Sequence, residues 1–89
     1  MNFFVYVILS YKNKKFLTYV GYTKNLKKRL LLHNTSKGAK FTRGRKWQII
    51  YKKVYKTKSK AMKEEYSLKK NKKKRNKIKN KFIKKKFIK

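Results

Sequence analysis

The balance of charge is the feature that most limits what this chain can fold into. Thirty-one of its 89 residues are lysine or arginine, whereas only two are carboxylates, the adjacent Glu64 and Glu65, so the formal net charge is +29. Repulsion among so many cations opposes the compact state, most strongly at low salt. A chain of this length can bury one small core. We therefore expect one small domain whose apolar residues share that core.

The same charge indicates a polyanionic partner, and nucleic acid is the leading candidate. A membrane surface is disfavoured because the basic stretches lack the broad apolar face of an interfacial helix. The longest apolar run, residues 3–9, is far shorter than the roughly 20 residues of a membrane span. Cysteine is absent, which excludes disulfides and thiolate zinc sites and fits an intracellular protein. With nucleic acid as the expected partner, we expect a cytoplasmic, nucleoid-associated location. An AT-rich genome would also favour lysine, but it does not explain the missing acids.

Three apolar segments predict the strands of a sheet. Residues 3–9 are aromatic and β-branched on both faces, as in a central strand that is buried on both sides. Residues 16–22 and 47–55 have a similar character, and the polar residues 10–15 are expected to connect the first two strands. A helix capped by Thr23 or Asn25 should follow the second strand, with a loop over residues 34–46.

A second helix, starting at Thr57 or Ser59, carries both carboxylates. At about 100° per residue, its apolar residues form a stripe whose centre falls close to Glu65, while Glu64 points toward solvent. The stripe consists of Ala61, Met62, Tyr66 and Leu68. A carboxylate on an apolar face needs a compensating cation or metal. The alternative for Glu65 is a simple helix pair with Lys69.

Five sequence elements, in a fixed order, resemble those of a known family, the GIY-YIG nuclease domain. The elements are Phe4-Val5-Tyr6, Tyr19-Val20-Gly21, Arg29 with His33-Asn34, the loop Lys37-Gly38-Ala39-Lys40 with Thr42-Arg43-Gly44, and the helix that carries Glu65. The resemblance covers about residues 3–80 and is closest to short, stand-alone bacterial members. Phe4 departs from the glycine of the family name, and Tyr22 stands where the DNA-repair incision branch has a lysine.

The resemblance implies an α+β fold with a small three-stranded antiparallel sheet flanked by helices. Residues 1–80 are expected to form the domain, with a third, basic helix that ends near Asn80. Residues 81–89 would form a basic tail, where repulsion between like charges favours a disordered or frayed arm that lies along DNA.

The resemblance also implies a divalent-metal-dependent endonuclease that hydrolyses DNA phosphodiester bonds. Glu65 would hold Mg²⁺ or Mn²⁺, and Arg29 would clamp the scissile phosphate beside His33. Tyr6 or Tyr19 would act as the base, with Tyr6 narrowly favoured. A phenol pKa near 10 must then fall by about three units, and the metal together with the positive field is the expected source. A late asparagine of the family corresponds to either Asn76 or Asn80.

Contacts with nucleic acid are expected from the loop and from the end of the second strand. The candidate residues are Gly21, Lys40, Arg43, Arg45 and Lys46. Trp47 is expected to pack in the core instead of stacking on a base. Since loop cations grip phosphates and not base edges, we expect double-stranded or branched DNA to be bound without base specificity. The resemblance also implies a structure-specific and repair-related role. Two alternatives remain: a non-catalytic protein that binds DNA or structured RNA, and a structural cation that coats nucleic acid.

Overall fold

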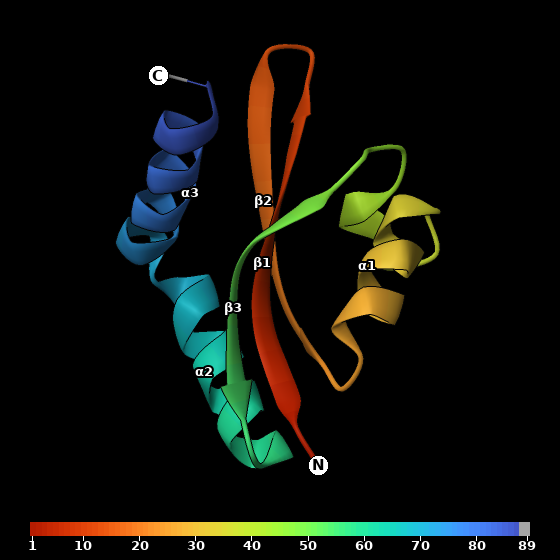
Figure 1. Cartoon of the computed structure of the whole chain (residues 1–89), viewed down its shortest axis with the longest axis vertical. Coiled ribbons are helices and arrows are strands. Elements are labelled where there is room, and N and C mark those ends of the chain that lie inside the picture. The colour runs from red at the N-terminus through yellow and green to blue at the C-terminus, as the bar shows by residue number, and fades with distance from the viewer. Residues whose placement is uncertain (88–89) are drawn as a thin grey trace.

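The structure, a computed structural model, describes residues 1–87. Its elements in chain order are β1 (Phe3–Lys12), β2 (Lys15–Thr23), α1 (Leu26–Asn34), the short 3₁₀ helix η1 (Lys40–Thr42), β3 (Gln48–Tyr55), α2 (Lys58–Lys70) and α3 (Lys72–Phe87). The strands form one antiparallel sheet in the order β2-β1-β3. Figure 1 shows the sheet between α1 on one side and α2 with α3 on the other. The expected α+β class and three-stranded antiparallel sheet are confirmed.

The first strand is central and is covered on both faces, as its uninterrupted apolar sequence predicts. From Val5 to Leu9 no residue is more than 2% exposed. Because side chains alternate across a strand, Val5 and Val7 point to one face of the sheet while Tyr6 and Ile8 point to the other.

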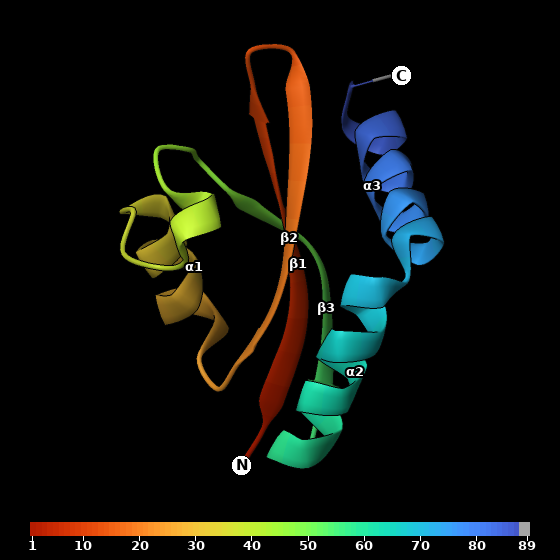
Figure 2. The same cartoon turned by 180° about the vertical axis from the view of Figure 1, so that it is seen from behind.

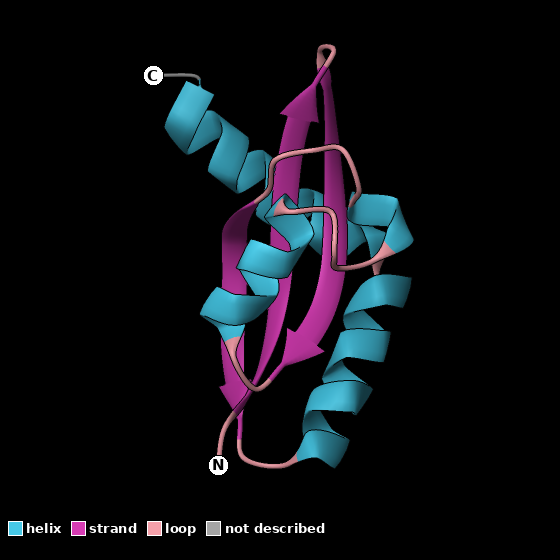
Figure 3. Cartoon of the chain, turned by 90° about the vertical axis from the view of Figure 1, so that its right-hand side faces the viewer, coloured by secondary structure: helices cyan, strands magenta, loops and turns pink. Residues whose placement is uncertain are grey.

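The two faces carry separate hydrophobic clusters, each beneath the helices that cover that face in Figures 2 and 3. On one face, Val5, Val7 and Val20 pack with Ala61 and Leu68 of α2. On the other face, the cluster consists of Tyr6, Ile8 and Trp47, with Leu17, Tyr19, Leu26, Leu30 and Ile49 packed against it. The sheet thus separates a layer that contains α1 from a layer that contains α2 and α3. As expected, Trp47 is a core residue, 4% exposed, and its indole N–H donates to the Thr42 carbonyl at 2.9 Å.

The β1–β2 connection is shorter than residues 10–15, and that expectation was wrong. Lys12 pairs with Lys15, so only Asn13 and Lys14 form the turn, with φ of 54° and 63°. Two successive residues with positive φ match the twist of a tight hairpin. The Tyr11 and Phe16 rings, 4.5 Å apart, form a cross-strand pair next to this turn and extend the ladder into the polar segment.

Side-chain caps fix where the first two helices begin. The Asn25 side chain accepts from the Lys28 amide at 3.0 Å, and the Thr57 hydroxyl accepts from the Lys60 amide at 3.2 Å. Each cap satisfies a backbone donor that has no partner within its helix. The sequence had left Thr23 or Asn25, and Thr57 or Ser59, as alternatives for these positions.

The last helix continues past Asn80, so the expected fraying was wrong for residues 81–87. Ile78 lies against the same cluster as α2, and Phe82 is half-buried beside β3. This packing compensates the repulsion between neighbouring lysines. The division into a domain of residues 1–80 and a tail remains a prediction, and residues 88–89 of that tail lie outside the described residues. Within residues 1–87, no helix is long and apolar enough to cross a membrane.

Candidate active site at the edge of the sheet

A hydrogen-bonded cluster joins the first strand to the helix α1. The Tyr6 hydroxyl lies 2.8 Å from Nε2 of His33, and the Nε–H of Arg29 donates to the same hydroxyl at 3.4 Å. Arg29 and His33 are four residues apart, so they project from the same side of α1. Tyr6 and His33 are buried, whereas Arg29 is only half-buried. The guanidinium is therefore anchored at Nε and retains donors that can face a ligand.

The buried histidine is held on both sides. Its Nδ1 lies 3.0 Å from the hydroxyl of Thr42, which itself donates to the Ala39 carbonyl at 2.9 Å. Since threonine has one hydroxyl proton, this arrangement places the imidazole proton on Nδ1 and leaves Nε2 as the acceptor for Tyr6. A Cβ on Gly38 would collide with Nδ1 of His33, so the glycine at the start of this loop leaves space for the ring.

The pKa values in this cluster favour the uncharged forms of its buried members. Burial, aided by the charge of Arg29, lowers the pKa of His33 to about 4. Burial likewise raises the pKa of Tyr6 above its usual value, with the hydrogen bond from Arg29 acting in the opposite direction and Glu65 adding to the rise. The positive field of the protein alone does not lower the pKa of this phenol, so that part of the expectation was wrong for Tyr6, while the effect of a metal remains a prediction. Desolvation of a buried phenolate outweighs the stabilisation provided by its one neighbouring cation.

The second tripeptide lies next to the first because Tyr6 pairs with Gly21. A Cβ at position 21 would overlap the end of the Tyr6 ring and its hydroxyl. Gly21, one of the candidate contacts to nucleic acid, is buried and leaves the space that Tyr6 occupies. Tyr19, two residues earlier on the same face, is half-buried, and its ring lies 5.1 Å from that of His33.

A pocket of about 290 Å³ at the β2 edge brings the two layers together. Its lining comes from β2, from η1 and from the helices of the opposite layer: Thr18, Tyr19, Val20, Phe41, Lys69 and Arg75. Lys69 also forms an ion pair with Glu65 at 3.5 Å. Glu65 thus lies next to this pocket and is close enough for its charge to act on Tyr6. Strand β2 is the edge at which groups from both sides of the sheet can reach one ligand.

The donor set suits a hard cation that keeps most of its water. Among residues 1–87 there is no group of three or more histidine or acidic side chains that could enclose a metal ion. Glu65 alone offers a carboxylate here, and its side chain is 17% exposed. Mg²⁺ typically binds through one or two carboxylates together with water and substrate phosphates. Glu65 fits that role, and its ion pair with Lys69 is the contact that a metal would replace.

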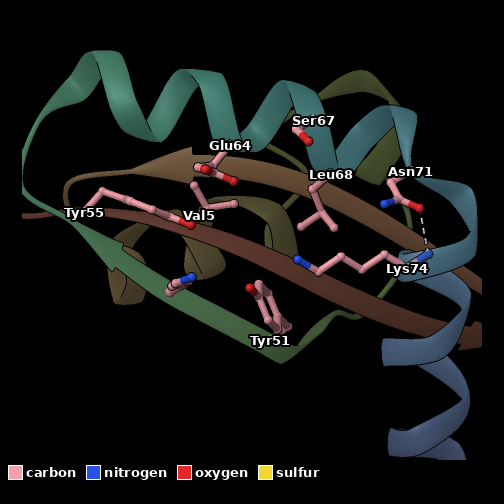
Figure 4. Close-up of a pocket in the computed structure, with 9 residues that line it drawn as sticks. Val5, Tyr51, Tyr55, Glu64, Ser67, Leu68, Asn71 and Lys74 are labelled. Carbon is pink, nitrogen blue, oxygen red and sulfur yellow. Dashed lines mark hydrogen bonds between the residues drawn. The ribbon is translucent and has the colours of Figure 1, made fainter.

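The neighbouring carboxylate is not the solvent-facing charge that helical phase predicted. Glu64 is half-buried and lines a pocket of about 70 Å³ with Tyr51 and Tyr55 of β3 (Figure 4). Burial, followed by the charge of Glu64, raises the pKa of Tyr55. The predicted stripe was wrong because Met62 and Tyr66 are 47% and 59% exposed.

The stripe that α2 buries therefore runs from Ala61 to Leu68. At about 100° per residue, the two glutamates lie on opposite flanks of it. Glu65 belongs to the β2 side of the sheet, and Glu64 belongs to the β3 side.

The predicted DNA-contacting residues of the loop fall into two groups. Lys40, Arg43 and Lys46 are exposed and can meet a ligand. Arg45 is half-buried, and its Nε–H donates to the Ser10 hydroxyl at 2.9 Å, which fastens the loop to the hairpin. Asn76 and Asn80 are both exposed.

A third asparagine, Asn71, has a structural task, because its side chain accepts from the Lys74 amide at 3.0 Å and caps α3. Sequence reasoning also missed Thr42 and Gly38 as supports of His33, although both lie within the loop motif that it singled out. It also missed Arg75, which lines the pocket at the β2 edge, because a single arginine does not stand out in a segment so rich in lysine.

A sequence profile of the GIY-YIG catalytic domain matches residues 2–79. The chain belongs to the GIY-YIG family. Relatives include a UPF0213 protein of Oceanobacillus iheyensis, 54% identical over 57% of this chain and 60% of its own length. A UPF0213 protein of Staphylococcus saprophyticus is 39% identical over 74% of this chain and 78% of its own length.

The solution NMR structure of a UPF0213 protein from Bacillus halodurans has 37% sequence identity and a TM-score of 0.45, with 84% of this chain and 81% of that chain covered. The match to the Oceanobacillus protein spans three fifths of that relative. Membership of the GIY-YIG family implies a nuclease domain.

Proposed function

We propose that this GIY-YIG protein is a divalent-metal-dependent endonuclease that hydrolyses phosphodiester bonds in DNA. The observation that carries the proposal is the pocket at the β2 edge, where Tyr19 lies beside the Arg29–Tyr6–His33 cluster and Lys69 carries the ion pair to Glu65. A pure binding protein needs cations but has no need for a carboxylate beside them. A cytoplasmic, nucleoid-associated location and a role in repair remain part of this proposal.

Each side chain has a separate task in the proposed reaction. Arg29, anchored at Nε by Tyr6, directs its remaining N–H donors to the scissile phosphate and stabilises charge as it develops there. Glu65 holds Mg²⁺ or Mn²⁺, which would supply charge neutralisation at the phosphate and the leaving oxygen. His33 and Thr42 keep Tyr6, and through it Arg29, in place.

The accessible tyrosine is the better candidate for contact with the attacking water. Before Tyr6 could accept a proton it would have to lose its own to His33, whose pKa is about 4. Because burial also raises the pKa of Tyr6 above its usual value, the proton stays on the phenol and this transfer is unfavourable. Tyr19 is half-buried and lines the pocket beside Glu65. We therefore place Tyr19 at the water and Tyr6 behind Arg29, which reverses the narrow preference drawn from sequence.

The test is cleavage of plain, flapped and branched DNA with Mg²⁺, with Mn²⁺ and with chelator. Parent protein should cut only with metal, whereas Glu65→Gln and Arg29→Lys should each lower kcat by roughly 10²–10³-fold while DNA binding persists. Tyr19→Phe should lower kcat as well.

Glu64→Gln is the matched control, because it removes the same charge from the adjacent residue of the same helix. It should retain parental activity. Equal activity of Glu65→Gln and the parent protein would refute the assignment, and metal-independent binding without turnover in every sample would favour the non-catalytic alternative.

A further inference from the structure

A groove runs between β3 and α3, on the edge of the sheet away from the candidate active site. Its volume is about 460 Å³. The floor consists of Ile50, Tyr51, Ile78 and Phe82, and the rim of Lys74, Lys77, Lys81 and Lys85. Because the strand order is β2-β1-β3, the central strand separates this groove from the pocket beside Tyr19. Figure 2 shows α3 alongside the upper part of the sheet.

The rim lysines lie on one side of α3. They are spaced three, four and four residues apart, so each lies about one turn, or roughly 5–6 Å, beyond the last. Neither β3 nor α3 contains an acidic residue. The groove therefore offers a row of positive charges at regular intervals, next to an apolar surface.

The floor is not closed by the rest of the chain. Ile50, Tyr51, Ile78 and Phe82 are all half-buried. Lysine stems can extend an apolar surface while their ammonium groups remain in water. Two of the four floor residues are aromatic, and a nucleobase stacks on such a ring whatever its sequence.

A second copy of the chain does not suit this groove, because each copy carries a net charge of +29. The occupant must be anionic along one side and apolar on the other. Unpaired nucleic acid has that chemistry, with phosphates along its backbone and exposed base faces. A duplex hides its base faces within the stack and can offer only its phosphates.

We propose that the groove between β3 and α3 binds a single-stranded segment of nucleic acid. Phosphates contact Lys77, Lys81 and Lys85, and bases lie against Tyr51 and Phe82. This inference rests on the proposed nuclease function, which it deepens by naming the substrate class: DNA in which a duplex at the active site carries an unpaired arm. Single-strand sites in other proteins combine the same two elements, a cationic track and aromatic platforms.

The experiment measures binding of a fluorescent oligothymidylate and of a blunt duplex, by anisotropy, in chelator so that no cleavage occurs. The groove variant Lys77→Gln/Lys81→Gln/Lys85→Gln is compared with Lys72→Gln/Lys73→Gln/Lys84→Gln, which removes equal charge from the same helix outside the groove. The groove variant should lose about tenfold or more in affinity for oligothymidylate, and the control no more than about threefold. Both should lose duplex affinity equally.

A second variant tests the floor. Phe82→Ala should weaken oligothymidylate binding by about fivefold or more and leave duplex binding unchanged, with folding verified by circular dichroism. An oligonucleotide with a photoreactive iodouracil should crosslink to the segment that contains Tyr51 or Phe82.

Equal losses in the two triple variants, or competition by polyglutamate as strong as that by oligothymidylate, would overturn the inference. Every measurement is made in chelator and without turnover, so its outcome does not depend on metal binding or catalysis. A negative result for binding in the groove is thereby distinguished from a negative result for the nuclease assignment.

Discussion

Lowering the pH from neutral to about 5 should destabilise this protein through one side chain, His33. The histidine is fully buried, and its pKa falls to about 4 in the folded protein from 6.5 in the unfolded chain. Between these values the unfolded chain binds the extra proton, so the free energy of unfolding decreases as the pH falls. The stabilisation is present above about pH 6.5 and is lost progressively toward about pH 4.

The magnitude follows from the two pKa values. Proton linkage with these values gives a loss of about 2 kcal/mol in the free energy of unfolding between about pH 7 and pH 5. That is a large share of the stability of a small domain. The composition makes the effect measurable, because the chain has a single histidine and only two carboxylates. Few other groups titrate in this range.

The assay is urea unfolding at constant ionic strength, followed by the fluorescence of the single tryptophan, Trp47, which is buried in the folded state. Independently, the C2 proton of the one imidazole gives one NMR titration curve for His33. In His33→Gln the difference in stability between the two pH values should largely disappear. An NMR pKa near 6.5, or an equal pH dependence in the variant, would refute the argument that burial keeps this ring neutral.

Three further outcomes are expected. Gly21→Ala should lower the free energy of unfolding by about 1–3 kcal/mol because its methyl group overlaps Tyr6. Thermal unfolding of Gly21→Ala, alone and combined with Tyr6→Phe, measures how much of this loss comes from the overlap with the hydroxyl. Arg45→Gln should lower the melting temperature because the contact with Ser10 is lost, whereas Arg43→Gln should leave it unchanged and weaken DNA binding. Affinity for duplex DNA should fall by about 10³-fold between about 50 and 200 mM salt if some six phosphates are contacted, and a shallow slope in titrations would contradict this.

Local sequence patterns predicted the order and type of the main elements because they act over short distances. An apolar run on both faces identifies a central strand wherever it occurs, and Asn25 or Thr57 can cap a helix without reference to the rest of the chain. The order of the two tripeptides, the arginine and the glutamate likewise lies in the sequence, which is why the GIY-YIG family could be recognised. The ends of elements were less certain: α3 continues past Asn80, where Ile78 packs against the core cluster and Phe82 lies beside β3.

Tertiary structure decided which faces and spaces those residues occupy. Helical phase alone placed Glu64 in solvent, yet the position of α2 over the sheet buries the stripe from Ala61 to Leu68 and leaves Met62 exposed. The sequence predicted Gly21 as a contact to nucleic acid and placed Gly38 in a loop motif, but only the structure shows that each leaves space for a ring brought to it from elsewhere in the chain. The sequence determined that two adjacent carboxylates stand among thirty-one cations. Only packing, which sets the neighbours and the exposure to water of each group, assigned one to the candidate active site and the other to the opposite edge of the sheet.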